Sequence, residues 1–118
     1  MSKKILVVED NELNRKLLVD ILENLGYEVT QAQDGEIALN LLTNNHFDLV
    51  LLDIQLPKIS GYEVMKQMPN KVPTIVVSAC CMADEISIAK DSGCLDYITK
   101  PVNVSEFVKK INTYLPLE

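Results

Sequence analysis

The chain has 118 residues, of which 47% are hydrophobic and 24% are charged, so it has the length of one domain and the composition of a globular protein. This composition excludes a disordered, collagen-like or low-complexity chain. The formal net charge of −6, with basic residues scattered singly or in pairs, argues against direct binding to nucleic acid or to a membrane surface.

Short apolar runs alternate with stretches of helical spacing along the whole chain. In the first half, the predicted elements are strand 4–9, a helix with an apolar stripe over 13–25, strand 27–32, a helix with a stripe over 37–42, and strand 48–53. Asn11 is a good N-cap for the first helix, Gly26 ends it, and the second helix ends near Asn44. The run DLVLLD holds four uninterrupted apolar residues, which is typical of a parallel strand covered on both faces.

The second half continues this alternation. Its predicted elements are helix 61–68, strand 72–78, helix 84–92, strand 95–98 and a last helix whose apolar residues run from Phe107 to Leu115. Asn103 and Glu106 form a capping box for that last helix. Five strand–helix units joined by right-handed crossovers predict an α/β fold, a three-layer sandwich with a parallel five-stranded sheet. We expect one domain over residues 1–118, with the flavodoxin-like strand order 2-1-3-4-5 and ligands beyond the carboxyl ends of the first and third strands.

Polar side chains stand at the strand ends where this topology places a ligand. The first strand ends in Glu9 and Asp10, and the third ends in Asp53. Ser78 ends the fourth strand, and Lys100 follows the fifth. Because the carboxyl ends of parallel strands meet at one edge of a sheet, we expect these groups to converge. A turn or helix-capping role is the alternative for Asp53 alone, but the combination favours a site.

Three clustered carboxylates must either raise a pKa or share a cation. Oxygen ligands without histidine or thiolate suit Mg²⁺, which keeps several waters and accepts phosphate oxygens. The metal and Lys100 would together offset about three negative charges from the carboxylates. This site predicts phosphoryl transfer, with Asp53 as nucleophile, Lys100 neutralising phosphoryl oxygens and Ser78 donating a hydrogen bond.

The chain has three cysteines, the adjacent Cys80 and Cys81 and the separate Cys94, and one histidine, His46. These residues support neither a disulfide framework nor a zinc site, and they indicate a reducing compartment. The apolar run near the start is too short for a signal peptide or a membrane span. We therefore expect a cytoplasmic protein, with the cysteines acting as small hydrophobic residues and His46 in a structural role. Redox sensing by the adjacent thiols is the alternative.

Four segments together resemble the response-regulator receiver domains of two-component signalling: VVEDN (7–11), LLDIQLPKISG (51–61), VVSA (76–79) and LDYITKP (95–101). The resemblance covers the whole chain, and the segments stand in the family's order on the predicted strand ends. Within the family, the chain is similar to single-domain, DivK-like regulators and to receivers attached to hybrid histidine kinases. Glu9 is a departure, because many members have Asp there.

The resemblance implies a phosphorylation site and its cofactor. Asp53 would be phosphorylated from a histidine of a kinase or a histidine phosphotransfer protein. Asp10 and Asp53 would ligate Mg²⁺ together with the backbone carbonyl of Gln55, and Glu9 would act through a metal-bound water. The isomer of the neighbouring Lys100–Pro101 bond stays open.

The resemblance also implies a switch. Lys100 and Ser78 would contact the phosphate, and Tyr97 would turn inward as Ser78 moves toward the phosphoryl group. Gln55 and Cys80 stand at the two positions that tune hydrolysis of the phosphate, and neither is a strong water activator, so we expect the phosphate to last. A downstream protein target would respond to the face formed by the fourth helix, the fifth strand and the fifth helix.

The first helix carries the residues that we expect to face a partner, Asn14, Arg15 and Leu18. Asn14 lies in the first turn, near the strand ends. Val19 lies off the apolar stripe, so we expect it to be exposed and to add to kinase docking. The last helix finishes within a few residues of Glu118, so we expect a receiver without its own output domain. A receiver excised from a longer protein is the alternative.

Two other function classes stay open. A Mg²⁺-dependent hydrolase with an aspartyl-phosphate intermediate would need a general acid just after the nucleophile, where this chain has the amide of Gln55. A degenerate receiver used only for docking would not need the acid cluster, Ser78 or Lys100. Nucleotide binding is disfavoured, because the chain has neither G-x-x-x-x-G-K-[ST] nor G-x-G-x-x-G. We therefore expect a signalling receiver rather than an enzyme.

Overall fold

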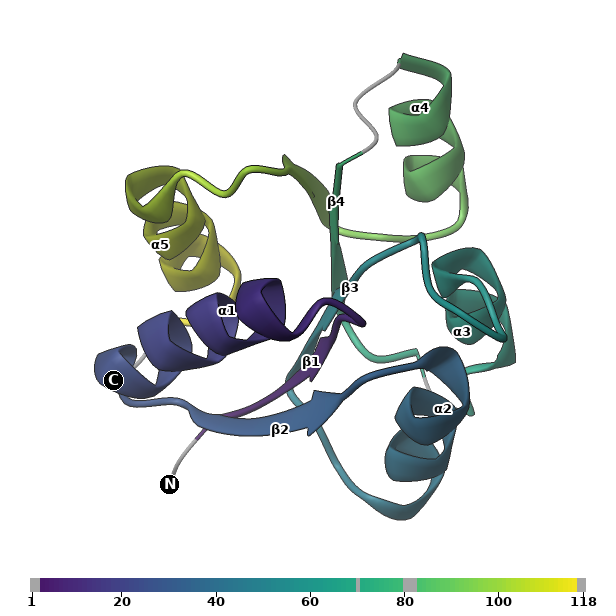
Figure 1. Cartoon of the computed structure of the whole chain (residues 1–118), viewed down its shortest axis with the longest axis horizontal. Coiled ribbons are helices and arrows are strands. Elements are labelled where there is room, and N and C mark those ends of the chain that lie inside the picture. The colour runs from purple at the N-terminus through teal and green to yellow at the C-terminus, as the bar shows by residue number, and fades with distance from the viewer. Residues whose placement is uncertain (1–2, 70, 80–82, 117–118) are drawn as a thin grey trace.

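The computed structural model describes residues 3–69, 71–79 and 83–116, and within them a parallel five-stranded sheet lies between two layers of helices (Figure 1). The elements are, in chain order, β1 (Lys4–Val8), α1 (Glu12–Leu25), β2 (Glu28–Ala32), α2 (Gly35–Asn44), β3 (Leu49–Leu52), α3 (Gly61–Gln67), β4 (Thr74–Ser78), α4 (Ala83–Asp91), β5 (Asp96–Thr99) and α5 (Val104–Tyr114). The strand order is β2-β1-β3-β4-β5, and every pairing is parallel. The predicted flavodoxin-like α/β fold is confirmed, with the predicted elements close to the observed ones in position and type.

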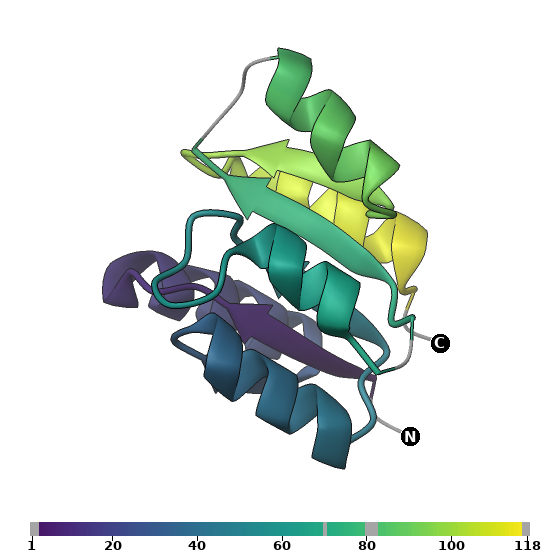
Figure 2. The same cartoon turned by 90° about the vertical axis from the view of Figure 1, so that its right-hand side faces the viewer.

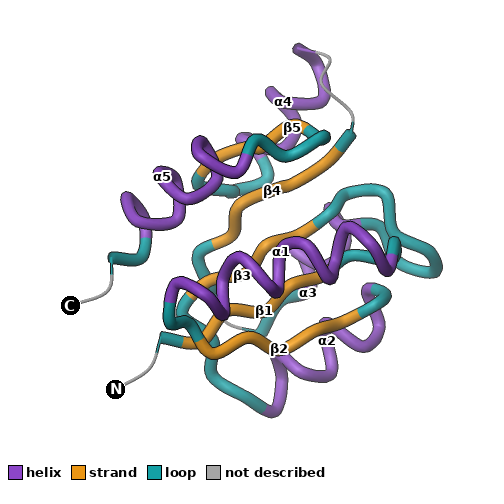
Figure 3. The backbone as a smooth tube through the Cα atoms, turned by 60° about the vertical axis from the view of Figure 1, so that its left-hand side comes forward, coloured by secondary structure: helices purple, strands orange, loops and turns teal. Residues whose placement is uncertain are grey.

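Different helices cover the two faces of the sheet. α1 and α5 lie on one face, which Figure 3 brings forward, and α2, α3 and α4 lie on the other, which faces the viewer in Figure 2. Successive residues of a strand point to opposite faces, so each strand contributes to both cores. In β3, Leu49 and Leu51 pack in the core beneath α1 and α5, whereas Val50 and Leu52 pack beneath the other helices. All four residues are buried, which confirms that β3 is covered on both faces.

Side chains and a glycine set the ends of the helices. Asn11 Oδ1 accepts a hydrogen bond from the Asn14 N–H at 3.0 Å, so Asn11 caps α1 as predicted. Gly26 has a φ of 102°, in the left-handed region, and ends α1. At α5, Asn103 Oδ1 accepts a hydrogen bond from the Glu106 N–H at 3.0 Å, which confirms the predicted N-cap.

Several smaller features bear on the sequence predictions. The Lys100–Pro101 peptide bond is cis. Cys94 is half-buried and packs against the core beneath α2, α3 and α4, as expected for a small hydrophobic residue. Cys80 and Cys81 lie outside the described residues, and so do the predictions made for them. Among the described residues, no helix combines the length and apolar character that crossing a membrane requires.

Candidate functional site

Two neighbouring strands bring three carboxylates together. β1 and β3 pair with Val8 beside Leu52, so the residues that follow them, Glu9 and Asp53, leave the sheet at the same edge. Asp10 comes directly after Glu9. Carboxylate oxygens of these three acidic residues all lie within 4.8 Å of one another. The predicted convergence of the carboxylates is therefore observed.

Lys100, which follows β5, reaches the same group. Its Nζ lies 2.7 Å from Asp53 Oδ2 and also forms an ion pair with Glu9 Oε1. The side chains are 14% exposed for Lys100, 2% for Glu9 and 6% for Asp53, so the ion pairs are largely shielded from water. The Lys100 N–H donates to the Ser78 carbonyl oxygen at 2.9 Å, which fixes the backbone from which the lysine extends.

Burial and ion pairing act in opposite directions on these groups. Burial raises the pKa of Glu9, and the hydrogen bond from Lys100 offsets only part of that effect. Burial acts to lower the pKa of Lys100, but the contacts with Asp53 and Glu9 outweigh it and raise that pKa above its ordinary value. Lys100 is therefore positively charged at neutral pH. One ammonium does not balance three clustered carboxylates, so the site attracts a further cation.

Backbone contacts hold the carboxylates in place. Glu9 Oε2 accepts a hydrogen bond from the Asn11 N–H at 3.1 Å, and Asp53 Oδ1 accepts one from the Gln55 N–H at 2.9 Å. The start of α3 packs on the same loop, since a β-carbon on Gly61 would lie 2.5 Å from the Asp53 carbonyl oxygen. Glycine is therefore required for α3 to approach the Asp53 backbone this closely.

β4 and β5 carry two further residues that the sequence singled out. Ser78 ends β4, is fully buried, and pairs in register with Thr99 of β5. Tyr97 is buried in the core beneath α2, α3 and α4. The structure places Ser78 at the predicted edge of the sheet and Tyr97 in the interior. Their roles in phosphate binding and switching stay predictions.

The surface of α1 differs from the prediction. Leu18 is 2% exposed and Val19 is 7% exposed, and both pack in the core that α1 shares with α5. The predictions that Leu18 faces a partner and that Val19 is exposed are wrong, because α1 packs on both β1 and β2 with Leu18, Val19 and Leu22 buried against them. The exposed apolar residues are instead Leu13 at 79% and Leu17 at 43%.

Asn14 and Arg15 lie close to the carboxylates. Asn14 is half-buried and, with Lys100, lines a cavity of about 100 Å³. Arg15 Nη1 donates to the Glu9 carbonyl oxygen at 2.9 Å, and its Nε donates to Gln31 Oε1 at 3.1 Å. Sequence reasoning missed these internal contacts of Arg15, because no pattern of charges reveals a bond to a backbone carbonyl.

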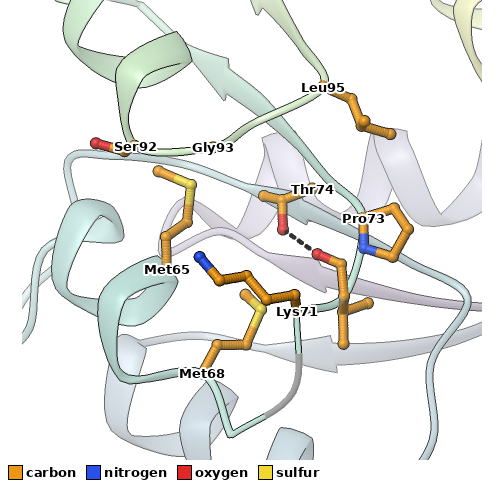
Figure 4. Close-up of a pocket in the computed structure, with 9 residues that line it drawn as sticks. Met65, Met68, Lys71, Pro73, Thr74, Ser92, Gly93 and Leu95 are labelled. Atoms are coloured by element: carbon orange, nitrogen blue, oxygen red, sulfur yellow. Dashed lines mark hydrogen bonds between the residues drawn. The ribbon is translucent and has the colours of Figure 1, made fainter.

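Two other features lie away from the carboxylates. His46 Nε2 is 3.2 Å from Asp48 Oδ1, just before β3, in keeping with a structural role. A cavity of about 240 Å³ lies at the amino ends of β4 and β5. Figure 4 shows the side chains of Met65 and Met68 beside Lys71 there. Both features lie at the amino-terminal edge of the sheet, opposite the carboxylates, and neither belongs to the candidate site.

A parallel α/β sandwich with an acidic group and a lysine at its carboxyl edge is typical of a receiver domain, and comparison with known proteins agrees. Residues 5–112 match the response regulator receiver domain family. The polar-differentiation response regulator DivK of Brucella ovis is 42% identical, and the match covers 98% of this chain and 98% of that protein. The chain therefore belongs to the response regulator receiver domain family, and the predicted resemblance is confirmed.

Two solved structures show the same fold. The receiver domain of the sensor histidine kinase PA1611 from Pseudomonas aeruginosa PAO1, with a magnesium ion coordinated in its active site cleft, is 28% identical, with a TM-score of 0.87 and coverage of 97% of this chain and 98% of that chain. The receiver domain of the Saccharomyces cerevisiae response regulator Ssk1, solved with the histidine phosphotransfer protein Ypd1, is 30% identical. Its TM-score is 0.87, and the match covers 96% of this chain and 88% of that chain.

The residues present fit a magnesium ion. Receiver domains bind Mg²⁺ at an acidic pocket, and the PA1611 receiver is described with the ion in place. In this chain the clustered donor atoms are all oxygens, which is the donor set that Mg²⁺ prefers. Glu9 and Asp53 are held by backbone hydrogen bonds, so their carboxylates are ordered before a cation arrives.

Proposed function

We propose that this receiver domain accepts a phosphoryl group on Asp53 from a phosphohistidine. A carboxylate oxygen of Asp53 would attack phosphorus while the phosphorus–nitrogen bond breaks, and the electron pair of that bond would return to the imidazole. The main support is the contact of Lys100 Nζ with Asp53 Oδ2 at 2.7 Å, inside the acidic group. An ammonium in this place neutralises the oxygens of an incoming phosphoryl group.

Asp10, Asp53 and the backbone carbonyl of Gln55 would hold Mg²⁺, with Glu9 acting through a bound water. When bound, the ion would supply positive charge that offsets the negative charge of the carboxylates and of the incoming phosphoryl group. The hydrogen bond from the Gln55 N–H orients the Asp53 carboxylate in advance, which reduces the reorganisation that the transfer requires.

Phosphorylation would act as a switch through β4 and β5. The phosphoryl group adds negative charge at the carboxyl edge of the sheet. Ser78 would donate its hydroxyl hydrogen to a phosphoryl oxygen, and Lys100 would pair with the phosphate instead of Glu9. Because Ser78 pairs with Thr99, this movement would reach Tyr97 on the same strand. The face of α4, β5 and α5 would then shift its population toward a form that binds a downstream protein.

The proposed phosphodonor is a histidine kinase or a histidine phosphotransfer protein. The Ssk1 receiver with Ypd1 supports this class of partner. The exposed Leu13 and Leu17, near the cavity that Asn14 and Lys100 line, offer an apolar surface beside the phosphorylation site. We place the exchange in the cytoplasm, in keeping with a set of cysteines that does not support a disulfide framework.

Labelling with a small phosphodonor tests this function. The purified protein is incubated with Mg²⁺ and an acyl phosphate, and its intact mass is compared with that of Asp53→Asn. We expect one phosphoryl group on the wild-type chain and none on the variant. Equal labelling of both, or no labelling even with a phosphorylated histidine phosphotransfer protein, would overturn the proposal. Repeated turnover of a phosphomonoester would indicate a hydrolase instead.

A further inference from the structure

The loop between β3 and α3, residues 53–60, contains a strained turn at Lys58. Lys58 has a φ of 69°, in the left-handed region that residues other than glycine seldom adopt. The Ile59 N–H donates to the Pro57 carbonyl oxygen at 2.8 Å, which closes a γ-turn around Lys58. A γ-turn with a positive φ is rare and strained, so contacts outside the turn must stabilise it.

The start of α2 provides those contacts. Lys58 Nζ lies 3.5 Å from Asp34 Oδ2 and 3.9 Å from Glu36 Oε2. The backbones also meet there, since a β-carbon on Gly35 would lie 2.7 Å from the Ile59 carbonyl oxygen. The Lys58 side chain is 56% exposed but that of Asp34 only 7%, so the pair closes over the packed junction of loop and helix.

Asp34 has both carboxylate oxygens engaged. Its Oδ1 accepts a hydrogen bond from the Ile37 N–H at 2.9 Å and caps α2, while Oδ2 faces Lys58. Asparagine is an equally good N-cap but carries no charge. Substituting asparagine at this position therefore removes the ion pair and keeps the cap.

The same loop carries a proposed ligand of the metal. The Gln55 N–H donates to Asp53 Oδ1 at 2.9 Å, and the Leu56 N–H donates to the Ile54 carbonyl oxygen at 3.1 Å. The backbone from Asp53 to Ile59 therefore consists largely of tight hydrogen-bonded turns. A change in the backbone at Lys58 will displace the Gln55 carbonyl, because the segment between them has little slack.

We propose that the Lys58–Asp34 pair is a positioning contact that holds the Gln55 carbonyl in place for Mg²⁺, an inference that rests on the function proposed above. Lys58 does not touch the ion or the phosphoryl group. It acts through the backbone of the loop, by fixing the strained turn against α2.

For Lys58→Met, electrostatics alone predicts a change in Mg²⁺ affinity opposite to the one that loss of positioning predicts, which makes the proposal testable. Lys58→Met removes a positive charge from the neighbourhood of a cation site, so by Coulomb's law Mg²⁺ should then bind as well as before or more tightly. Loss of positioning should weaken binding instead. Lys66→Met is the matched control, because Lys66 is an exposed lysine of the adjacent helix α3 and its loss changes the charge equally.

Calorimetric titration with Mg²⁺ on the purified full chain measures the effect. We expect the dissociation constant to rise about threefold in Lys58→Met and in Asp34→Asn, and to rise by about the same threefold in the double variant, because losing either partner breaks the same contact. Lys58→Arg, which keeps the positive charge, should keep the wild-type affinity for Mg²⁺, and Lys66→Met should not weaken it. Melting temperatures without Mg²⁺ report on folding. If Lys58→Met is unstable, Lys58→Gln gives the same test, because glutamine also removes the charge and suits the exposed position of this side chain.

The inference would be overturned if the folded, uncharged Lys58 variants bound Mg²⁺ with wild-type affinity. It would also be overturned if the effects of the two single substitutions added in the double variant. Neither result would bear on the labelling of Asp53. Failure of the wild-type chain itself to bind Mg²⁺ or to be labelled on Asp53 would instead overturn the proposed function. The two failures are therefore distinguishable.

Discussion

Arg15 Nη1, on α1, donates a hydrogen bond to the carbonyl oxygen of Glu9 at 2.9 Å, directly before Asp10. The same guanidinium reaches the edge strand β2, where its Nε donates to Gln31 Oε1 at 3.1 Å. One side chain therefore joins the first helix, the edge of the sheet and the loop that carries two of the clustered carboxylates. This contact holds the loop in place independently of a bound cation.

Arg15→Met should lower the free energy of unfolding by about 1 kcal/mol, because hydrogen bonds from a half-buried cation are lost. Lys16→Met is the matched control. Lys16 pairs with Asp20 at 3.1 Å, but both side chains are largely exposed, so their pairing contributes little. Urea denaturation followed by circular dichroism measures both variants. Equal stability of the two would contradict an internal role for Arg15.

Gly61→Ala should displace Asp53, the proposed phosphorylation site. The new β-carbon would lie 2.5 Å from the Asp53 carbonyl oxygen and 2.7 Å from Ile54 Cα, so α3 and the Asp53 backbone must separate. We expect a loss of about 2 kcal/mol in unfolding free energy and slower labelling of Asp53 by a small phosphodonor.

Gly93→Ala separates this effect from a general loss of stability. Gly93 has a φ of 101°, which disfavours a side chain, but the space around it is open. We expect this variant to lose about 1 kcal/mol of stability and to keep the wild-type labelling rate. Slow labelling in both glycine variants would show that reduced stability, rather than displacement of Asp53, is the cause.

The fold and the carboxylate group were predictable because both follow from strand order and apolar periodicity. The uninterrupted apolar run of β3 indicated a strand covered on both faces, and the parallel order places Glu9, Asp10 and Asp53 at one edge. Each of these features depends on the position of a residue within a strand or helix, and that position can be read from the apolar periodicity of the sequence.

The contacts that hold the loops in place were not predictable in the same way. The contact of Arg15 with the Glu9 carbonyl and the γ-turn at Lys58 depend on the path of the backbone between elements, which no periodicity encodes. The burial of Leu18 and Val19 depends on how α1 lies across β1 and β2, so it becomes visible only when the sheet is assembled.

Lys100→Met should destabilise the protein in the absence of Mg²⁺ by about 3 kcal/mol, because Glu9 and Asp53 would stay buried without their counter-ion. Added Mg²⁺ should restore part of this loss, because the cation neutralises the same carboxylates. Thermal unfolding with and without Mg²⁺ measures the effect. A variant whose melting temperature responds to Mg²⁺ no more than that of the wild type would contradict this shared role.

The hydroxyl of Tyr27 donates to the Leu115 carbonyl oxygen and joins the start of β2 to the end of α5. Burial raises the pKa of Tyr27 above its ordinary value of 10.0. The folded chain therefore holds the phenolic proton more tightly than the unfolded chain. This contribution to stability is complete below about pH 10 and is lost as the pH rises through the folded-state pKa.

Tyr27→Phe should be less stable than the wild type by about 1 kcal/mol at neutral pH, because it lacks the hydrogen bond. The difference should narrow at about pH 11, where the wild type loses the contribution of the phenolic proton and the variant has none to lose. Denaturation curves for both proteins at the two pH values test this. A difference that stays constant with pH would contradict the raised pKa.

Leu13→Ala and Leu17→Ala should leave stability within about 0.5 kcal/mol of the wild type, because both leucines are on the surface. Leu18→Ala, one position further along, should cost about 3 kcal/mol, because it opens a cavity in the core. Urea denaturation of the three variants tests which of these leucines α1 exposes. A large loss in the Leu13 variant would contradict its exposure.

The surface leucines should matter for the protein partner and not for the chemistry. Neither Leu13 nor Leu17 takes part in the contacts of Asp53 or Lys100, so labelling by a small phosphodonor should keep its rate in both variants. Transfer from a phosphorylated histidine phosphotransfer protein should slow, because such a donor must dock beside the site and bury apolar surface there. Equal slowing with both donors would mean that the substitutions disturb the site itself. Unchanged transfer from the protein donor would mean that the partner docks elsewhere.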